Sequence, residues 1–170
     1  KVDEYFRRHK KIPLPPVMHD NLETLLPKEK QSNIGSSNRI LVIGDVHGCL
    51  EELQLLVQKA IHNHNNGQQF KAIILVGDLC NKGPYSAEVI RYVRSQSINN
   101  NWFCVRGNHD DRALLAALGH EDICNKPRYQ WVKELSDEDV EWMSKLPYTI
   151  RIPASMLLVD EDAKHVKQDV

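Results

Sequence analysis

The chain has 170 residues, of which 41% are hydrophobic and 26% charged, a composition typical of one soluble globular domain. Its net charge of −1 gives no general reason to expect nucleic acid or a membrane surface as a partner, and no apolar run approaches the length of a membrane span. None of the four cysteines belongs to a C-x-x-C pair, which argues against a zinc ribbon; we expect reduced thiols and a cytoplasmic location. The chain begins at Lys1 rather than Met, so we expect a fragment or a processed product.

Residues 1–38 are predicted to form a flexible arm. The first part of this segment is basic, and prolines at positions 13, 15 and 16 interrupt regular structure. A short helix is expected at residues 20–26, and Pro27 would end it. Residues 31–38 are polar, with one glycine and three serines, which is typical of a linker.

Apolar runs alternate with amphipathic segments between residues 39 and 118. The runs at residues 39–43, 71–76 and 102–105 predict strands that are buried on both faces of a sheet. Each run is followed by a polar turn and then by apolar residues at helical spacing, as in the helices expected at residues 50–61 and 110–118. This order predicts an α/β fold with parallel strands and right-handed crossovers.

The rest of the chain extends this domain, which we place at residues 39–159. Residues 136–139 form a capping-box pattern before a helix. Residues 148–152 alternate like a strand, and residues 156–159 form a further apolar run. Residues 160–170 are mostly charged and polar, and we expect them to form a tail.

Three similar polar turns follow the three predicted strands. They read Gly-Asp-Val-His-Gly at residues 44–48, Gly-Asp-Leu-Cys-Asn-Lys-Gly at residues 77–83, and Gly-Asn-His-Asp at residues 107–110. The turns are spaced by about one βαβ unit each. Because parallel strands end at the same edge of a sheet, we expect all three turns to meet there.

The side chains in these turns are suited to binding two divalent metal ions. Asp45 and His47 are two residues apart and can reach the same ion, Asp78 can use both carboxylate oxygens to bridge two ions, and Asn108 can offer its carbonyl oxygen to the second. Such donors suit manganese, iron or zinc, with magnesium as a further candidate. Two ions about 3.5–4 Å apart would hold the attacking and leaving oxygens of a phosphoryl displacement. They would also lower the pKa of a shared water, so that hydroxide is available near neutral pH.

Neighbouring residues can supply the rest of a phosphatase site. His109 follows Asn108 directly and can protonate the leaving oxygen, while Lys82 and Arg106 can neutralise phosphate oxygens. A P-loop does not fit, because Lys82 stands where the second glycine of that motif would fall. A serine nucleophile is also unsupported, since the chain has no G-x-S-x-G turn.

The three turns resemble the signature motifs of metallophosphoesterases of the phosphoprotein phosphatase superfamily. Asn81 and Lys82 make the chain most similar to ApaH-like phosphatases, kin of bacterial symmetrical diadenosine tetraphosphatases, because protein serine/threonine phosphatases carry an Asp-Arg pair there. The resemblance covers about residues 39–152. It implies the same metal and acid residues, and hydrolysis of a dinucleoside polyphosphate, an RNA cap or inorganic polyphosphate.

One departure from the wider family concerns Asn81. An aspartate at this position would pair with the acid histidine and hold it charged. Asn81 can orient the imidazole of His109 but supplies no charge, so we expect a more acidic pH optimum for leaving-group protonation. Lys82 likewise offers a point charge where arginine would offer a bidentate fork.

The other departure is at the C-terminal end. The resemblance implies two further histidine ligands for the second metal, one of them in a turn after a strand like residues 156–159. Here that run continues into Asp160-Glu161-Asp162, and His165 is out of register. We therefore expect a βαβαβ half of an α/β sandwich with its C-terminal sheet largely missing, and a second metal site holding only Asp78 and Asn108.

Three functional hypotheses remain. The first is a two-metal phosphoesterase that uses water to hydrolyse a phosphoanhydride or phosphomonoester. The second is a protein serine/threonine phosphatase with the same mechanism, and the third is a catalytically inert fragment. The sequence leaves the substrate and the oligomeric state open.

Overall fold

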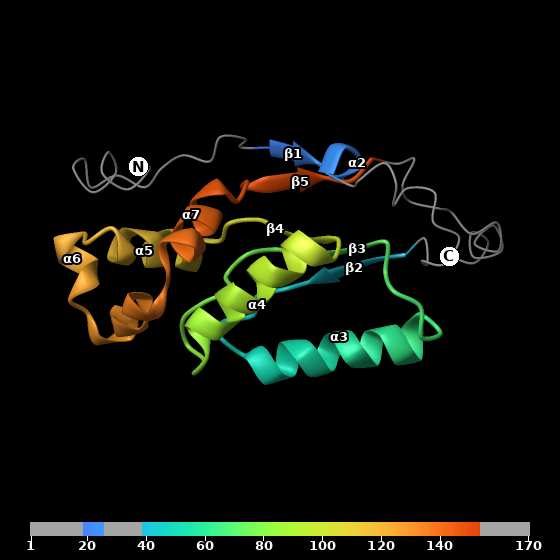
Figure 1. The fold of residues 1–170 in the computed structure, drawn as a ribbon, viewed down its shortest axis with the longest axis horizontal. Helices are drawn as coiled ribbons and strands as arrows, with labels where there is room; N and C mark the ends of the chain where they lie inside the picture. The colour runs from blue at the N-terminus through green and yellow to red at the C-terminus, as the bar shows by residue number, and fades with distance from the viewer. Residues whose placement is uncertain (1–18, 26–38, 154–170) are drawn as a thin grey trace, which may run out of the picture.

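The computed structural model of the protein describes residues 19–25 and 39–153 (Figure 1). Each of the three predicted βα units is present, with element ends that differ from the expected ones by a few residues. The elements in chain order are β1 (His19–Asn21), α2 (Leu22–Leu25), β2 (Ile40–Ile43), α3 (Leu50–His64), β3 (Ala72–Leu75), α4 (Ser86–Asn99), β4 (Trp102–Cys104), α5 (Asn108–Ala117), α6 (Glu121–Cys124), the 3₁₀ helix η2 (Pro127–Glu134), α7 (Asp137–Lys145) and β5 (Thr149–Arg151).

The central sheet is parallel, with strand order β2-β3-β4. Ile40 pairs with Ala72, and Ile73 pairs with Trp102, so the three strands end at the same edge. All four residues of β3 are buried, as expected for a strand in the middle of a parallel sheet. The predicted α/β fold class is thus confirmed.

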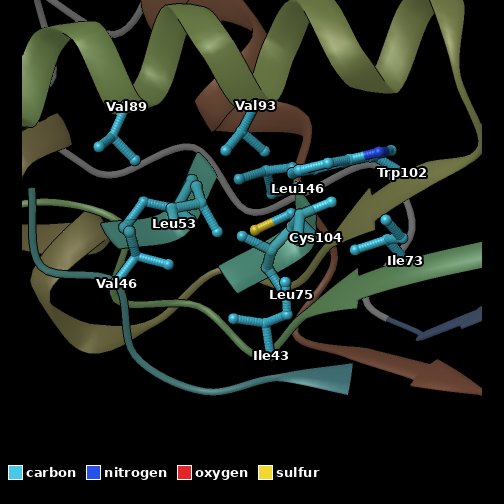
Figure 2. Packing of buried hydrophobic residues seen from close by; sticks show 12 residues of the cluster. Ile43, Val46, Leu53, Ile73, Leu75, Val89, Val93, Trp102, Cys104 and Leu146 are labelled. Atoms are coloured by element: carbon cyan, nitrogen blue, oxygen red, sulfur yellow. The ribbon is translucent and has the colours of Figure 1, made fainter. Parts of the chain in front are cut away.

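Helices α3 and α4 cover one face of this sheet (Figure 1). Leu53 from α3, together with Val89 and Val93 from α4, packs on the alternate strand residues that point to this side, including Leu75 and Cys104 (Figure 2). Fully burying side chains of this size stabilises the fold by roughly 1.5–3 kcal/mol each. This cluster is the main core, and it holds the sheet edge that carries the three polar turns.

The opposite face of the sheet is covered by a small second sheet (Figure 1). Strand β1 pairs in parallel with β5, and Leu22 packs on Ala72 and Ile74. Residues 19–25 lie within the segment predicted to form a flexible arm. The short helix expected at residues 20–26 is present as α2, but strand β1 was not expected. The strand could not be anticipated, because its partner, β5, lies more than a hundred residues further along the chain.

This second sheet covers only part of the face. Val42 and Val76 lie beyond it and are 54% and 45% exposed. The structure therefore agrees with the expected half sandwich in the residues described. The basic cluster near the N-terminus, the apolar run at residues 156–159, the tail at 160–170 and His165 lie outside the described residues.

Two helix boundaries differ from the sequence-based ones. Helix α3 continues to His64, beyond the expected end at residue 61. Helix α5 begins at Asn108 rather than Asp110, so Asn108 and His109 occupy its first turn. Among the helices in the described part of the chain, none has the length and apolarity that crossing a membrane requires.

Candidate functional site

Three loops meet at the carboxyl edge of the central sheet. We call residues 44–49 the first loop, residues 77–85 the second and residues 105–110 the third. The carbonyl oxygen of Asp78 accepts hydrogen bonds from the amides of Val46 (3.1 Å) and His47 (2.9 Å). The amide of Gly83 in turn donates to the carbonyl oxygen of His47 at 2.7 Å, so the first and second loops are joined through their backbones.

Four side chains in these loops stand on left-handed backbone. The φ angle is 49° at His47, 51° at Asp78, and 67° at both Asn81 and Lys82. Each such residue costs of order 1–3 kcal/mol and persists only where the surroundings hold it. The hydrogen bonds between the first and second loops provide that restraint, and the result is that four polar side chains point in directions that regular backbone would not allow.

The third loop approaches Asp78 closely. The backbone amide of His109 donates to Asp78 Oδ1 at 2.9 Å. A Cβ atom at Gly107 would lie 2.1 Å from that oxygen and 2.3 Å from the Asp78 backbone nitrogen, far inside any allowed contact. Only glycine therefore permits this approach, which places the start of α5 against Asp78.

His47 is held in an orientation that suits a metal ligand. Its Nδ1 lies 3.1 Å from the carbonyl oxygen of Cys80. A carbonyl only accepts, so Nδ1 carries the proton and Nε2 keeps its lone pair. This second contact is the one that metal-binding histidines usually make. Nε2 also lies 3.4 Å from Asp45 Oδ2 and 2.7 Å from Lys82 Nζ, so the Lys82 ammonium donates to the lone pair that would bind a metal ion.

The structure brings most of the predicted site residues together. One ligand atom each from His47, Asp78 and His109 lie within 4.8 Å of one another, and Asp45 adjoins His47. Asn108 is the first residue of α5 and is exposed. The donor set of carboxylate and imidazole fits a divalent transition metal.

Asn81 contacts the predicted acid histidine. Its side chain is almost fully buried, at 6% exposure, and its Nδ2 lies 3.3 Å from Nδ1 of His109. The indole nitrogen of Trp131 lies 3.2 Å from Asn81 Oδ1 on the other side. The imidazole rings of His47 and His109 meet edge to face, with centroids 4.8 Å apart.

The structure places Arg106 differently from the predicted phosphate contact. Its side chain is fully buried and forms an ion pair with Asp111 at 3.0 Å. It also donates to the carbonyl oxygen of Ser144 and to the hydroxyl of Tyr148, at 3.1 and 2.9 Å. The guanidinium therefore ties the third loop to α5, to α7 and to the residues that follow α7. The motif could not reveal this, because Ser144 and Tyr148 are about forty residues further along.

Asp110 is a site residue that the sequence did not single out. It is completely buried and accepts hydrogen bonds from the amides of Leu79 (3.0 Å) and Gly107 (2.9 Å), so it connects the second and third loops. Burial raises its pKa from 3.8 to about 6, although the hydrogen bonds from Gly107, Cys80 and Leu79 oppose this. Its place as the last residue of the third motif, in the first turn of a helix, was the available signal.

Cys80 is a fully buried thiol beside the site. All four cysteines are free of disulfides. Burial raises the pKa of the Cys80 thiol well above its ordinary value, and the neighbouring Asp110 carboxylate raises it further. A neutral buried thiol is a poor nucleophile, so Cys80 serves as a small apolar side chain in the core.

Comparison with known proteins relates most of the chain, and not only the three loops, to one family. The model of the calcineurin-like phosphoesterase family matches residues 38–166. A symmetrical bis(5'-nucleosyl)-tetraphosphatase of Cronobacter sakazakii is 38% identical over 127 residues, which cover 74% of this chain and 40% of that protein. The enzyme of the same name from Nitrosococcus oceani is 35% identical over 114 residues, with 66% and 39% covered.

A solved structure supports the same relationship. A protein provisionally described as a diadenosine tetraphosphatase matches with a TM-score of 0.55 and 28% identity, over 81% of this chain and 51% of that one. The chain thus spans about two fifths of the length of the curated relatives given above.

We predict that Gly107→Ala weakens divalent metal binding. The new Cβ would collide with Asp78 and displace its carboxylate, and disturbing the support of a ligand typically costs about 10–100-fold in metal affinity. Calorimetric titration of the metal-free chain with Zn²⁺ measures the loss. Gly44→Ala is the matched control, because a Cβ there meets nothing within 4 Å; equal affinities for the two variants would contradict the prediction.

We also predict a pH-dependent stability difference between the metal-free chain and its Asp110→Asn variant. The folded-state pKa of about 6 lies above the ordinary 3.8, so between these values the folded state binds more protons than the unfolded state. The contribution of Asp110 is therefore fully present below about pH 4, and it falls by up to about 3 kcal/mol as pH rises past 6. Urea unfolding across this range tests it. A constant difference would refute it, and exposed Asp122→Asn serves as the control.

Proposed function

We propose that this chain, which belongs to the calcineurin-like phosphoesterase family, is the metal-binding part of a hydrolase that cleaves phosphoanhydride bonds of dinucleoside polyphosphates. The observation that carries the proposal is the convergence of His47, Asp78 and His109 at one sheet edge, with ligand atoms within 4.8 Å. Two curated relatives named as symmetrical tetraphosphatases support the substrate class.

In this proposal, Asp45 and His47 would hold one divalent ion, Asn108 would hold a second, and Asp78 would contact both. Such ions would supply Lewis-acid polarisation of the phosphoryl group and an acidified attacking water. Manganese, iron and zinc all suit this donor set. The hydrogen bond from the His109 amide to Asp78 Oδ1 keeps the carboxylate in place.

The chain's own side chains complete the chemistry. Lys82 Nζ lies 2.7 Å from His47 Nε2, so its positive charge is at the site and can neutralise a phosphate oxygen. His109 donates a proton to the leaving phosphate oxygen as its bond to phosphorus breaks. Asn81 orients the ring of His109 from the opposite side. We assign Arg106 no substrate contact, because its guanidinium is engaged by Asp111 and Tyr148.

Other substrates, and the absence of any activity, are the alternatives to this proposal. RNA caps and inorganic polyphosphate contain the same phosphoanhydride bond, and a phosphoprotein would present a phosphomonoester. An inert fragment is a further alternative, because about three fifths of the Cronobacter sakazakii relative lies outside the match.

A substrate panel with Mn²⁺ tests the proposal: diadenosine tetraphosphate, capped RNA, long-chain polyphosphate and a phosphopeptide. We expect diadenosine tetraphosphate to be cleaved fastest and Asp78→Asn to reduce its hydrolysis by at least about 100-fold, since the variant loses the bridging charge. Unchanged hydrolysis by Asp78→Asn would show that the bridging assignment is wrong. About one ion per chain without hydrolysis of any substrate would favour the inert fragment.

The pH dependence of hydrolysis tests the role of Asn81. The Asn81→Asp variant places a negative charge beside His109, which stabilises the protonated ring. We expect its pH–rate profile to extend to higher pH than that of the unmodified chain. Coincident profiles would contradict the assignment of His109 as the acid that Asn81 orients.

A further inference from the structure

A small cavity lies beside the candidate metal site. Its volume is about 100 Å³, and its walls come from the end of β2, the first loop and the first two turns of α3. Asp45 belongs to the wall of the cavity, and its Oδ2 lies 3.4 Å from His47 Nε2. The cavity and the metal site therefore share a residue, so one bound molecule can reach both.

The wall that α3 contributes is one face of that helix. Its residues, counted from the N-cap, are spaced i, i+3, i+4 and i+7, the spacing of a single helix face: Cys49, Glu52, Leu53 and Leu56. Leu53 is 3% exposed and packs with Val46 in the main core, so the two form the floor (Figure 2). Leu56 is 45% exposed and stands with the exposed Glu52 at the rim.

The charges of the cavity exclude a phosphate group as its ligand. Asp45 and Glu52 are both carboxylates, and none of the described residues that line the cavity is cationic. An anionic group would be repelled there. When Asp45 contacts a metal ion, Glu52 remains as a hydrogen-bond acceptor. The cavity thus suits an uncharged group that carries a donor.

The shape and the apolar surface favour a flat ring. An apolar cavity of about 150 Å³ holds a benzene ring, so this smaller cavity admits part of a purine, and Leu56 extends the apolar surface beyond its mouth. The faces of such a ring can contact Leu53 and Leu56 while a donor on its edge reaches Glu52. Adenine has this chemistry, because its N6 amino group is a donor on the edge of a flat ring.

We propose that the cavity between the first loop and α3 is a nucleobase subsite that holds one adenine of the substrate, with Glu52 accepting a hydrogen bond from the adenine amino group. The inference rests on the proposed function for the identity of the substrate, but binding of the base depends only on the cavity. It also orients the substrate, with the phosphates at Lys82 and the metal ligands and one base against α3.

Adenosine binding to the metal-free chain tests the subsite without any catalysis. In a titration followed by ¹H–¹⁵N NMR, we expect the amides of residues 46–56 to shift, with a dissociation constant in the millimolar range that is typical of a small ligand. Inosine carries a carbonyl oxygen in place of the amino group. We expect it to bind about tenfold more weakly, the effect of one hydrogen bond to a charged group. Equal affinities, or no shifts at these residues, would overturn the proposal.

Two pairs of variants on α3 provide matched controls, and all four side chains are exposed. Leu56→Ser removes the apolar rim, whereas Leu55→Ser changes a neighbour that is 49% exposed and does not line the cavity. We expect Leu56→Ser to weaken adenosine binding about fivefold. Glu52→Gln should remove the preference for adenosine over inosine, since an amide can both accept and donate, and Glu51→Gln should keep it. Equal effects within either pair would contradict the proposal.

Kinetics separate this inference from the proposed function. Long-chain polyphosphate has no base, so we expect Leu56→Ser to raise the KM for diadenosine tetraphosphate about fivefold and to leave polyphosphate hydrolysis unchanged. Adenosine binding with the expected preferences but without hydrolysis of either substrate would support the subsite and count against the proposed function. Hydrolysis of diadenosine tetraphosphate with the same KM in Leu56→Ser and Leu55→Ser would count against the subsite alone.

Discussion

The three loops of the site depend on one residue, Asp78, which binds its neighbours through both backbone and side chain. Its carbonyl oxygen accepts the amides of Val46 and His47, and its carboxylate accepts the amide of His109. The left-handed φ of 51° at Asp78 lets its carbonyl oxygen point toward the first loop while its carboxylate points toward the third loop. The rest of the site follows from this constraint, because Asp78 holds the first and third loops at the same time.

Burial of apolar side chains and backbone hydrogen bonds offset the free-energy cost of this arrangement. Strained residues and a buried carboxylate would each destabilise a small domain by themselves. Here the main core beside β3, in which Leu75 and Val89 are fully buried, holds the strand ends in position (Figure 2). Asp110 accepts the amides of Leu79 and Gly107, which would otherwise be left without a partner when the second and third loops close together.

Polar contacts behind the site also fix the orientation of each imidazole. The carbonyl oxygen of Cys80 lies behind His47 and the side-chain amide of Asn81 lies behind His109, while the two rings meet edge to face. Neither contact involves a charged group.

The sequence by itself determined the strand–helix alternation, the parallel sheet and the residue types that gather at its edge, because hydrophobic periodicity and turn motifs are local properties. Asp45, His47, Asp78 and His109 could therefore be identified from the three turns alone. The tertiary structure decided that residues 19–21 pair with β5, that Arg106 is buried against Asp111 and Tyr148, and that Trp131 contacts Asn81. Most of these partners are forty or more positions apart in the chain. Local patterns carry no information about such contacts, which form only when the packed core brings distant segments together.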